Sequence, residues 1–276
     1  MKNRKRLNQT KIISVTSGKG GVGKTNLVCN LAYCFASMGK KVMIMDADLS
    51  LGNVSVVLGL APKYNISNVL YGDKQLKDII ISDKNGILVL PASSGIPELS
   101  NLTEMQKMTL MTRFGDLLSD IDMLLIDTGA GISSNVIYFN LAAGEIMVVI
   151  TPEPTSITDA YALIKVMSTK HGQKNFSIIL NMAKNEKEAK SIYKHLSIVA
   201  DKFLKVSLSY AGFILYDDNI SKSVIMQKTA MELYPESKSA SCFKKLAYDI
   251  ISKNENDYSD GNLQFFFNNL FKNERN

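Results

Sequence analysis

A glycine-rich run near the start of the chain has the residue types needed to hold phosphate groups. Residues 18–25 read Gly-Lys-Gly-Gly-Val-Gly-Lys-Thr, which matches the pattern G-x-x-x-x-G-K-[ST]. Glycines let backbone N–H groups converge on phosphate oxygens, and a helix that begins at the loop adds the positive end of its dipole. Lys24 can place a charge on the terminal phosphates, and Thr25 can offer its hydroxyl to Mg²⁺. The run therefore predicts a nucleoside triphosphate site.

Carboxylates follow two short apolar runs of the chain. Asp46 and Asp48 come at the end of residues 41–46, and Asp127 ends the run 123–127. The carboxyl ends of parallel strands share one edge of a sheet, where ligands bind in open α/β folds. An Asp-x-Asp at a strand end can also be a turn or a helix cap. Beside a phosphate-binding loop, we interpret these acids as groups that act on Mg²⁺ and the reacting phosphate.

Alternating strands and helices are expected to position these groups. Apolar runs rich in β-branched residues predict parallel strands, at 11–17, 41–46, 87–91, 123–127, 146–151, 176–181 and 208–214. Periodic apolar positions and capping residues predict helices between them, at 25–38, 103–118, from 152, 186–202, 217–227 and 239–253, with short helices over 54–84. This order predicts an α/β fold with a doubly wound, mainly parallel sheet of the P-loop NTPase class.

The composition is that of a globular protein. Of the 276 residues, 46% are hydrophobic and 21% are charged, which is enough apolar material for one large domain. No apolar run reaches the length of a membrane span, and no apolar segment follows the basic N-terminus as in a signal peptide. The three cysteines form no C-x-x-C pair, so we expect reduced thiols in a cytoplasmic protein.

The net charge of +6 is concentrated at the N-terminus. Residues 1–11 hold five lysines and arginines and no acid, so the rest of the chain is close to neutral. A near-neutral body argues against a DNA-binding face, whereas a basic tail can attract anionic lipid or nucleic acid. A solvated tail without a partner is the alternative.

Four segments follow from these patterns: a basic tail at 1–10, a globular domain at 11–253, a polar linker at 254–262 and a C-terminal segment at 263–276. On a helical wheel, five large apolar residues of the last segment gather on one face: Leu263, Phe266, Phe267, Leu270 and Phe271. This short amphipathic helix is typical of a weak, reversible anchor, and we expect residues 263–272 to bind an anionic membrane surface. A helix packed on the domain, or one bound in a partner's groove, is the alternative.

The lysine inside the glycine-rich loop, Lys19, makes this run resemble the deviant P-loop of the MinD/ParA superfamily. The resemblance implies ATP and Mg²⁺ as cofactors, ATP hydrolysis, and a homodimer that closes around ATP with Lys19 on the partner's nucleotide. Residues 46–54 resemble the family's switch I, and residues 127–131 resemble its switch II. These two segments are called switch I and switch II below.

Carried over by position, the resemblance assigns roles to single residues. The catalytic residues would be Lys19, Lys24 and Asp48, of which Asp48 orients the attacking water. The Mg²⁺ residues would be Thr25, Asp46 and Asp127, the last at the Walker B position. The nucleotide-binding residues would be Gly18, Lys19, Gly20, Gly21, Val22, Gly23, Lys24, Thr25, Asn26 and Asn181. Asn181 would bind adenine, and the chain lacks the guanine-selecting Asn-Lys-x-Asp motif, so ATP is favoured over GTP.

Three further stretches, residues 91–99, 127–133 and 151–161, resemble the FlhG (YlxH, FleN) family of regulators of flagellar number and placement. The resemblance implies a cytoplasmic ATPase that binds reversibly to the inner face of the cell membrane. It also implies an FlhF-type GTPase and flagellar C-ring proteins as partners. Residues 1–10 lack the Asp-Gln-Ala-x-x-Leu-Arg motif of many relatives, so stimulation of the GTPase is not implied.

Three other functions are weighed against this one. A ParA-type DNA-partitioning ATPase would need a basic face on the domain. An iron–sulfur carrier would need dimer-bridging cysteines in the central chain, and none lies between Cys34 and Cys242. A MinD-type division-site ATPase shares the chemistry, and only the three stretches named above separate it from the FlhG family.

Overall fold

The structure is a computed structural model that describes residues 10–49, 51–93, 95–118 and 120–252. The linker expected at 254–262, the amphipathic helix expected at 263–276 and the basic residues 2–6 lie outside the described residues, so the expectations about them stay predictions. No helix in the described part of the chain is long and apolar enough to cross a membrane.

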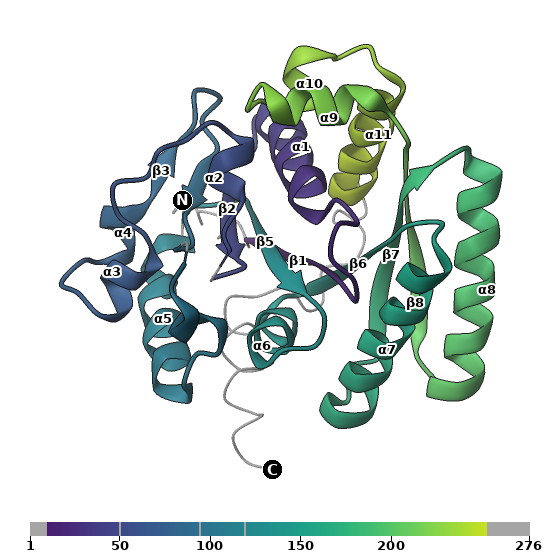
Figure 1. Cartoon of the computed structure of the whole chain (residues 1–276), viewed down its shortest axis with the longest axis horizontal. Helices are drawn as coiled ribbons and strands as arrows, with labels where there is room; N and C mark the ends of the chain where they lie inside the picture. Colours follow the sequence, from purple (N-terminus) through teal and green to yellow (C-terminus); the bar gives the residue numbers. More distant parts are fainter. Residues whose placement is uncertain (1–9, 50, 94, 119, 253–276) are drawn as a thin grey trace, which may run out of the picture.

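An eight-stranded sheet runs through the middle of the molecule (Figure 1), in the order β3-β4-β2-β5-β1-β6-β7-β8. The strands are β1 Lys11–Ser17, β2 Val42–Ala47, β3 Ile81–Ser82, β4 Leu88–Leu90, β5 Met123–Ala130, β6 Glu145–Ile150, β7 Asn175–Ala183 and β8 Ser207–Leu215. All neighbours are parallel except β3 and β4. Since β2, β5 and β1 are adjacent, their carboxyl ends meet at one edge.

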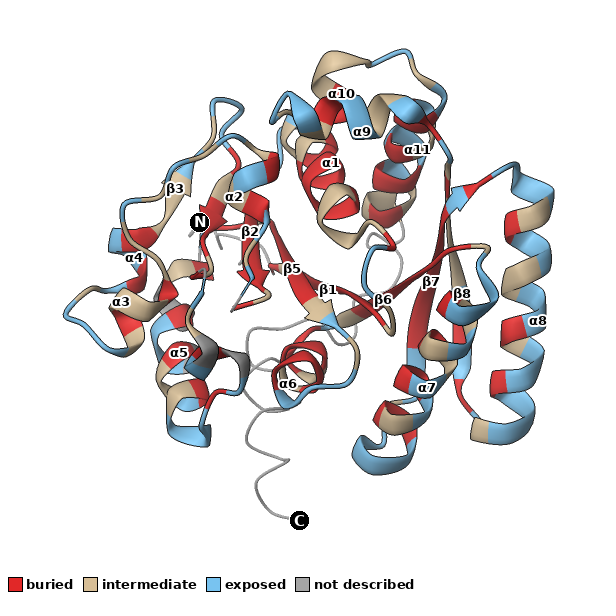
Figure 2. Cartoon of the chain, in the orientation of Figure 1, coloured by how far each residue is buried: buried red, intermediate tan, exposed pale blue. Residues whose placement is uncertain are grey.

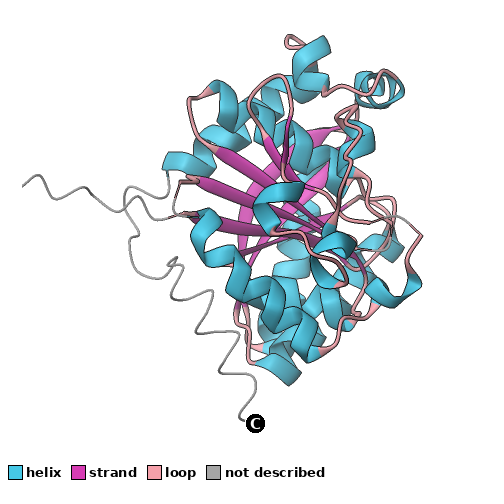
Figure 3. Ribbon diagram, turned by 90° about the vertical axis from the view of Figure 1, so that its left-hand side faces the viewer, coloured by secondary structure: helices cyan, strands magenta, loops and turns pink. Residues whose placement is uncertain are grey.

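Helices cover both faces of the sheet (Figure 3). They are α1 Lys24–Ser37, α2 Val54–Val57, α3 Ile66–Leu70, α4 Leu76–Ile79, α5 Glu104–Leu118, α6 Ser134–Ala142, α7 Pro154–His171, α8 Glu186–Leu204, α9 Asp218–Ile225, α10 Ala230–Leu233 and α11 Lys238–Ser252, with a 3₁₀ turn at Pro97–Ser100. Alternate β1 side chains divide the core: Ile13 packs with α1 and α11, and Ile12 packs with α5 and α6. Buried residues line both layers (Figure 2). The doubly wound α/β prediction is confirmed.

Three elements escaped the sequence prediction, and each has a physical reason. β3 has two residues, too few for a readable alternation, and it pairs antiparallel with β4 at the edge. α6 is buried on almost every side, so its apolar residues show no helical period. α10 is a single turn, held through the buried Asn30, whose Oδ1 accepts from Met231 N at 3.0 Å.

Thr10, expected in the basic tail, is packed against the domain. Thr10 is 1% exposed, and its hydroxyl bonds the carbonyl oxygens of Leu118 and Ile121 at 2.7 and 2.8 Å. These contacts fix the start of β1 against the end of α5. Thr10 therefore belongs to the domain and not to the basic tail.

Candidate nucleotide-binding site

The loop between β1 and α1 has the shape that its glycines predict. Gly21 and Gly23 have φ of 78° and 88°, which side chains rarely adopt. A Cβ at Gly18 would lie 2.1 Å from the carbonyl oxygen of Asp159 in α7, so only glycine fits there. Val22 is 3% exposed and packs into the core, which leaves its backbone to face a ligand. Gly20 lies in open space.

The N-terminus of α1 is open toward the ligand edge. Gly23, which precedes the helix, has no side chain to cap it, and the first turn contains no acid. The N–H groups of this turn, to which Thr25 and Asn26 belong, are therefore free to meet an anion. Lys24 Nζ donates to Ser17 Oγ at 2.8 Å, within the loop. Burial lowers the pKa of Lys24, an effect that the charges of Asp127 and Asp48 oppose.

Two carboxylates meet behind the loop at the ends of β2 and β5. Asp46 and Asp127 are register partners and each is 2% exposed. Among the described residues, neither Oδ1 atom has a hydrogen-bond partner. Burial, reinforced by the charge of Asp127, raises the pKa of Asp46 to about 8. Burial also raises the pKa of Asp127 to about 7, although Thr25 donates a hydrogen bond to it and Lys24 lies near. A cation placed between them would favour the ionised form of both groups.

This donor set fits Mg²⁺. Magnesium is usually held by one or two carboxylates plus phosphate oxygens and water, and not by a complete protein cage. The buried oxygens of Asp46 and Asp127 beside the Thr25 hydroxyl supply such a partial set. No cluster of three or more His, Cys, Asp or Glu side chains that could hold a metal occurs in the described residues.

Asp48 stands where switch I meets switch II. A Cβ at Gly129 would lie 3.6 to 3.7 Å from the three atoms of the Asp48 carboxylate group. Asp48 is half-buried, unlike Asp46, and so stays accessible to water. The third carboxylate therefore borders the same site as the two that fit Mg²⁺.

The loop lysine, Lys19, is turned away from its own phosphate-binding loop. Its Nζ donates to Glu153 Oε2 at 2.6 Å and to Thr155 Oγ1 at 2.9 Å. Glu153 directly precedes α7, whose first residue is Pro154. The Lys19 and Glu153 side chains are 38% and 64% exposed, so this ion pair lies in water and is weak.

Asn181 is placed under the loop. Its Nδ2 donates to Val22 O at 2.8 Å, and its Oδ1 accepts from Met182 N at 3.0 Å. A Cβ at Gly23 would lie 2.4 Å from the same Nδ2. Asn181 thus holds the loop through one N–H of its side-chain amide, and the same amide group has a second N–H. The adenine contact expected for Asn181 stays a prediction.

The structure brings twelve of the thirteen predicted positions together around one loop and two strand ends, with Asn181 beneath them. Sequence reasoning missed Ser17, which holds Lys24, and Glu153 with Thr155, which hold Lys19. Glu153 could have been found because it follows the predicted strand at 146–151 at the ligand edge. Ser17 carries no such signal, because a serine at a strand end is common.

Fold and site together define a nucleotide-binding protein of the P-loop class. The family model described as "AAA domain" matches residues 10–182. The chain is 41% identical over 270 residues to the antiactivator FleN of Pseudomonas aeruginosa, covering 98% of this chain and 96% of FleN. It is 34% identical to the flagellum site-determining protein YlxH of Helicobacter pylori, covering 95% and 90%. The septum site-determining protein MinD of Pyrococcus horikoshii, complexed with Mg-ADP, has a TM-score of 0.73 at 28% identity, covering 87% and 96%.

The chain belongs to the MinD/ParA family of P-loop ATPases, within the group that contains FleN and YlxH and is also called FlhG.

Proposed function

We propose that this chain is an ATP-hydrolysing switch that dimerises on ATP, binds the inner face of the cell membrane and regulates the number or placement of flagella. The flagellar role is supported by identity to FleN and YlxH over nearly the whole chain. Partners would be an FlhF-type GTPase and flagellar C-ring proteins. The single structural observation behind the switch is the outward position of Lys19, held by an exposed ion pair beside a loop that has its own lysine, Lys24.

Hydrolysis would proceed by attack of water on the γ-phosphate of ATP. Bound Mg²⁺ would supply positive charge to the phosphate oxygens. Lys24 would leave the Ser17 hydroxyl for the phosphates, while Thr25 and Asp127 would hold the cation and Asp46 would support its shell. Asp48 would hold the attacking water beside Gly129. The bond between the γ-phosphorus and the oxygen that bridges to the β-phosphate would break, giving ADP, inorganic phosphate and a proton. Lys19, supplied by the partner subunit, offsets the charge that develops in the transition state.

The oligomeric state tests the proposal directly. Light scattering is measured on the full chain with Mg-ADP and with a non-hydrolysable ATP analogue. We expect a monomer with ADP and a dimer with the analogue, no dimer for Lys19→Ala, and a long-lived dimer with ATP itself for Asp48→Ala. A Lys19→Ala dimer, or normal turnover by Asp48→Ala, would contradict the assignment. An ATP dimer that binds DNA would favour the ParA-type function instead.

A further inference from the structure

Switch I is hydrogen-bonded to a partly buried stretch of chain that leads from β4 to α5. We call residues 91–93 and 95–102 the bridging segment. Ser93 Oγ donates to Leu49 O at 2.8 Å, and Gly52 N approaches Ser93 O at 3.5 Å. Ser93 is 1% exposed. The first end of the bridging segment therefore moves with the backbone of switch I.

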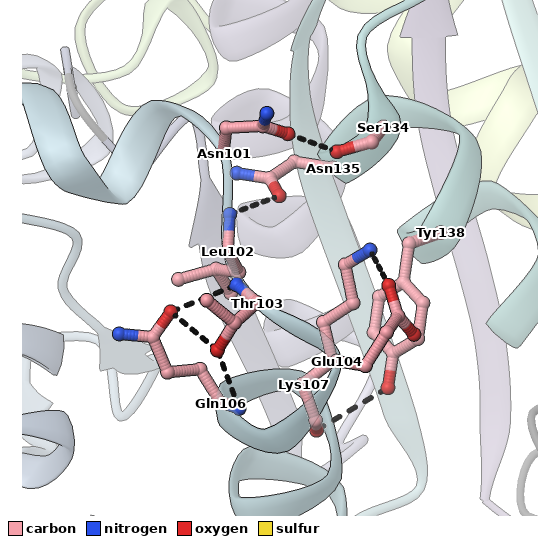
Figure 4. A network of polar contacts seen from close by, with 9 residues as sticks. All are labelled: Asn101, Leu102, Thr103, Glu104, Gln106, Lys107, Ser134, Asn135 and Tyr138. Atoms are coloured by element: carbon pink, nitrogen blue, oxygen red, sulfur yellow. Dashed lines mark hydrogen bonds and ion pairs between the residues drawn. The ribbon is translucent and has the colours of Figure 1, made fainter.

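The other end of the bridging segment is fastened to the helix that follows switch II (Figure 4). Leu102 N donates to Asn135 Oδ1 at 3.0 Å. Asn135 Nδ2 donates to Leu99 O at 2.8 Å. Beside them Ser134 Oγ donates to Asn101 Oδ1. Asn135 is the second residue of α6 and is 5% exposed. Both polar atoms of its side chain therefore make hydrogen bonds to the bridging segment.

Switch II is in turn bonded to the phosphate-binding loop. Gly131 N donates to Ser17 O at 2.9 Å, and the side chain of the same serine holds Lys24. Two residues beyond Gly131, Ser133 caps α6 through a hydrogen bond from Val136 N. A movement of switch II at the γ-phosphate end of the site would therefore be passed along only a few residues to Asn135.

Buried contacts add to the hydrogen bonds near both ends of the bridging segment. Leu49 of switch I and Leu99 and Leu102 of the bridging segment belong to one buried cluster. Gly52 touches the segment so closely that a Cβ there would lie 2.6 Å from Ala92 Cβ. Hydrogen bonds between buried groups are costly to break without replacement. A segment held at both ends by such contacts resists the movement of one switch without the other.

We propose that the bridging segment couples switch I to switch II, and that Ser93 and Asn135 are the positioning residues at its two ends. The inference rests on the proposed nucleotide switch and adds the means by which its two halves change together. Neither residue touches the nucleotide site itself. Each acts through the backbone that it holds, so loss of either should affect the distant switch more than the near one.

Amide hydrogen exchange on the full chain tests this coupling. The probes are Mg-ADP and a non-hydrolysable ATP analogue with Mg²⁺, and the readout is the slowing of exchange in peptides that cover each switch. In Asn135→Ala we expect switch II to keep its response, and we expect the response of switch I to fall at least threefold. In Ser93→Ala, a milder change, we expect switch I to keep its response and the response of switch II to fall. Affinity for ADP should stay unchanged and kcat should fall at constant KM.

Thr103→Ala is the matched control. Thr103 caps α5 next to the bridging segment, with its Oγ1 accepting from Gln106 N, and is exposed. The Thr103→Ala substitution should leave the nucleotide responses of both switches intact. The coupling is refuted if both switches of Asn135→Ala and of Ser93→Ala respond as in the unmodified chain, or if the variants lose ADP affinity, which would indicate a general structural role. If neither switch of the unmodified chain responds, the proposed nucleotide switch itself fails, and the coupling fails with it.

Discussion

At the scale of single residues, Asp46 and Asp127 hold a proton that a cation must displace. Burial raises their pKa to about 8 and about 7, above the ordinary value of 3.8. Their charged forms are therefore disfavoured in the folded, ligand-free chain, and the stability they contribute falls as pH rises from about 4 toward 8. A metal ligand must be deprotonated, so binding of Mg²⁺ releases protons.

We therefore expect the affinity for Mg-ADP to rise between pH 6 and pH 8, by up to about tenfold per pH unit for each proton that the cation displaces. Titration calorimetry in two buffers of different ionisation enthalpy measures the protons released. ADP with EDTA is the control and should release fewer. Equal proton release with and without Mg²⁺, or an affinity for Mg-ADP that does not change with pH, would show that the two carboxylates do not hold the cation.

A second residue-scale prediction concerns Lys19. An exposed ion pair is worth about 0–1 kcal/mol, and freeing Lys19 from Glu153 removes that cost before dimerisation. Glu153→Gln should tighten ATP-dependent dimerisation by up to about fivefold per subunit, or up to about 25-fold in the dimer Kd because two pairs are released, and leave ADP affinity unchanged. Sedimentation velocity at several protein concentrations gives the dimer Kd. A weaker dimer would mean that Glu153 contributes more to the dimer than to the monomer.

At the scale of elements, the fit between β1 and α7 depends on one missing side chain. A Cβ at Gly18 would lie 2.1 Å from Asp159 O, a backbone atom that cannot turn away, whereas at Gly20 it would meet nothing within 4 Å. Gly18→Ala must therefore push α7 off the loop, at a cost of about 2 kcal/mol of unfolding free energy. Gly20→Ala should change it by less than about 0.5 kcal/mol.

Urea unfolding of the ligand-free chain measures this difference. Both variants replace glycine by alanine in the same loop, so the effect on the unfolded state is shared and cancels. Equal stability of the two variants would show that α7 yields to the extra methyl group without cost.

At the scale of the whole molecule, membrane attachment is expected to depend on the dimer. If a membrane buried about four of the five apolar side chains expected on one face of residues 263–272, it would gain at most roughly 6–12 kcal/mol before the cost of ordering, so a single copy is expected to bind weakly. Two copies in a dimer act at a high effective concentration. We expect the full chain to sediment with anionic liposomes mainly with a non-hydrolysable ATP analogue, and a chain ending at residue 262 to stay in solution.

Phe266→Ser in the full chain is the matched control, because it keeps the length of the segment and removes apolar area. It should lower the bound fraction severalfold in the ATP state. Full sedimentation of the shortened chain would place the membrane contact on the domain. No sedimentation in any state would favour a docked helix or a protein ligand, and DNA binding would be tested next.

Local chemistry in the sequence determined the site and most of the fold. The glycines of residues 18–25 allow the positive φ angles that Gly21 and Gly23 adopt, and strands that end in Asp46 and Asp127 carry their acids to one edge in any parallel sheet. Helices with one polar face, such as α8 and α11, showed their period directly. β3, α6 and α10 did not, because they are too short or too fully buried to show one.

Only the tertiary structure decided which side chains meet across long stretches of sequence. The pair of Lys19 with Glu153 joins residues 134 apart, and Asn135 reaches back 36 residues to Leu99. A serine, an asparagine or a glutamate near a strand end or a helix start satisfies many local roles equally well, so its type does not reveal its partner. The pKa values of Asp46 and Asp127 likewise follow from burial and mutual distance, which exist only once β2 and β5 lie side by side.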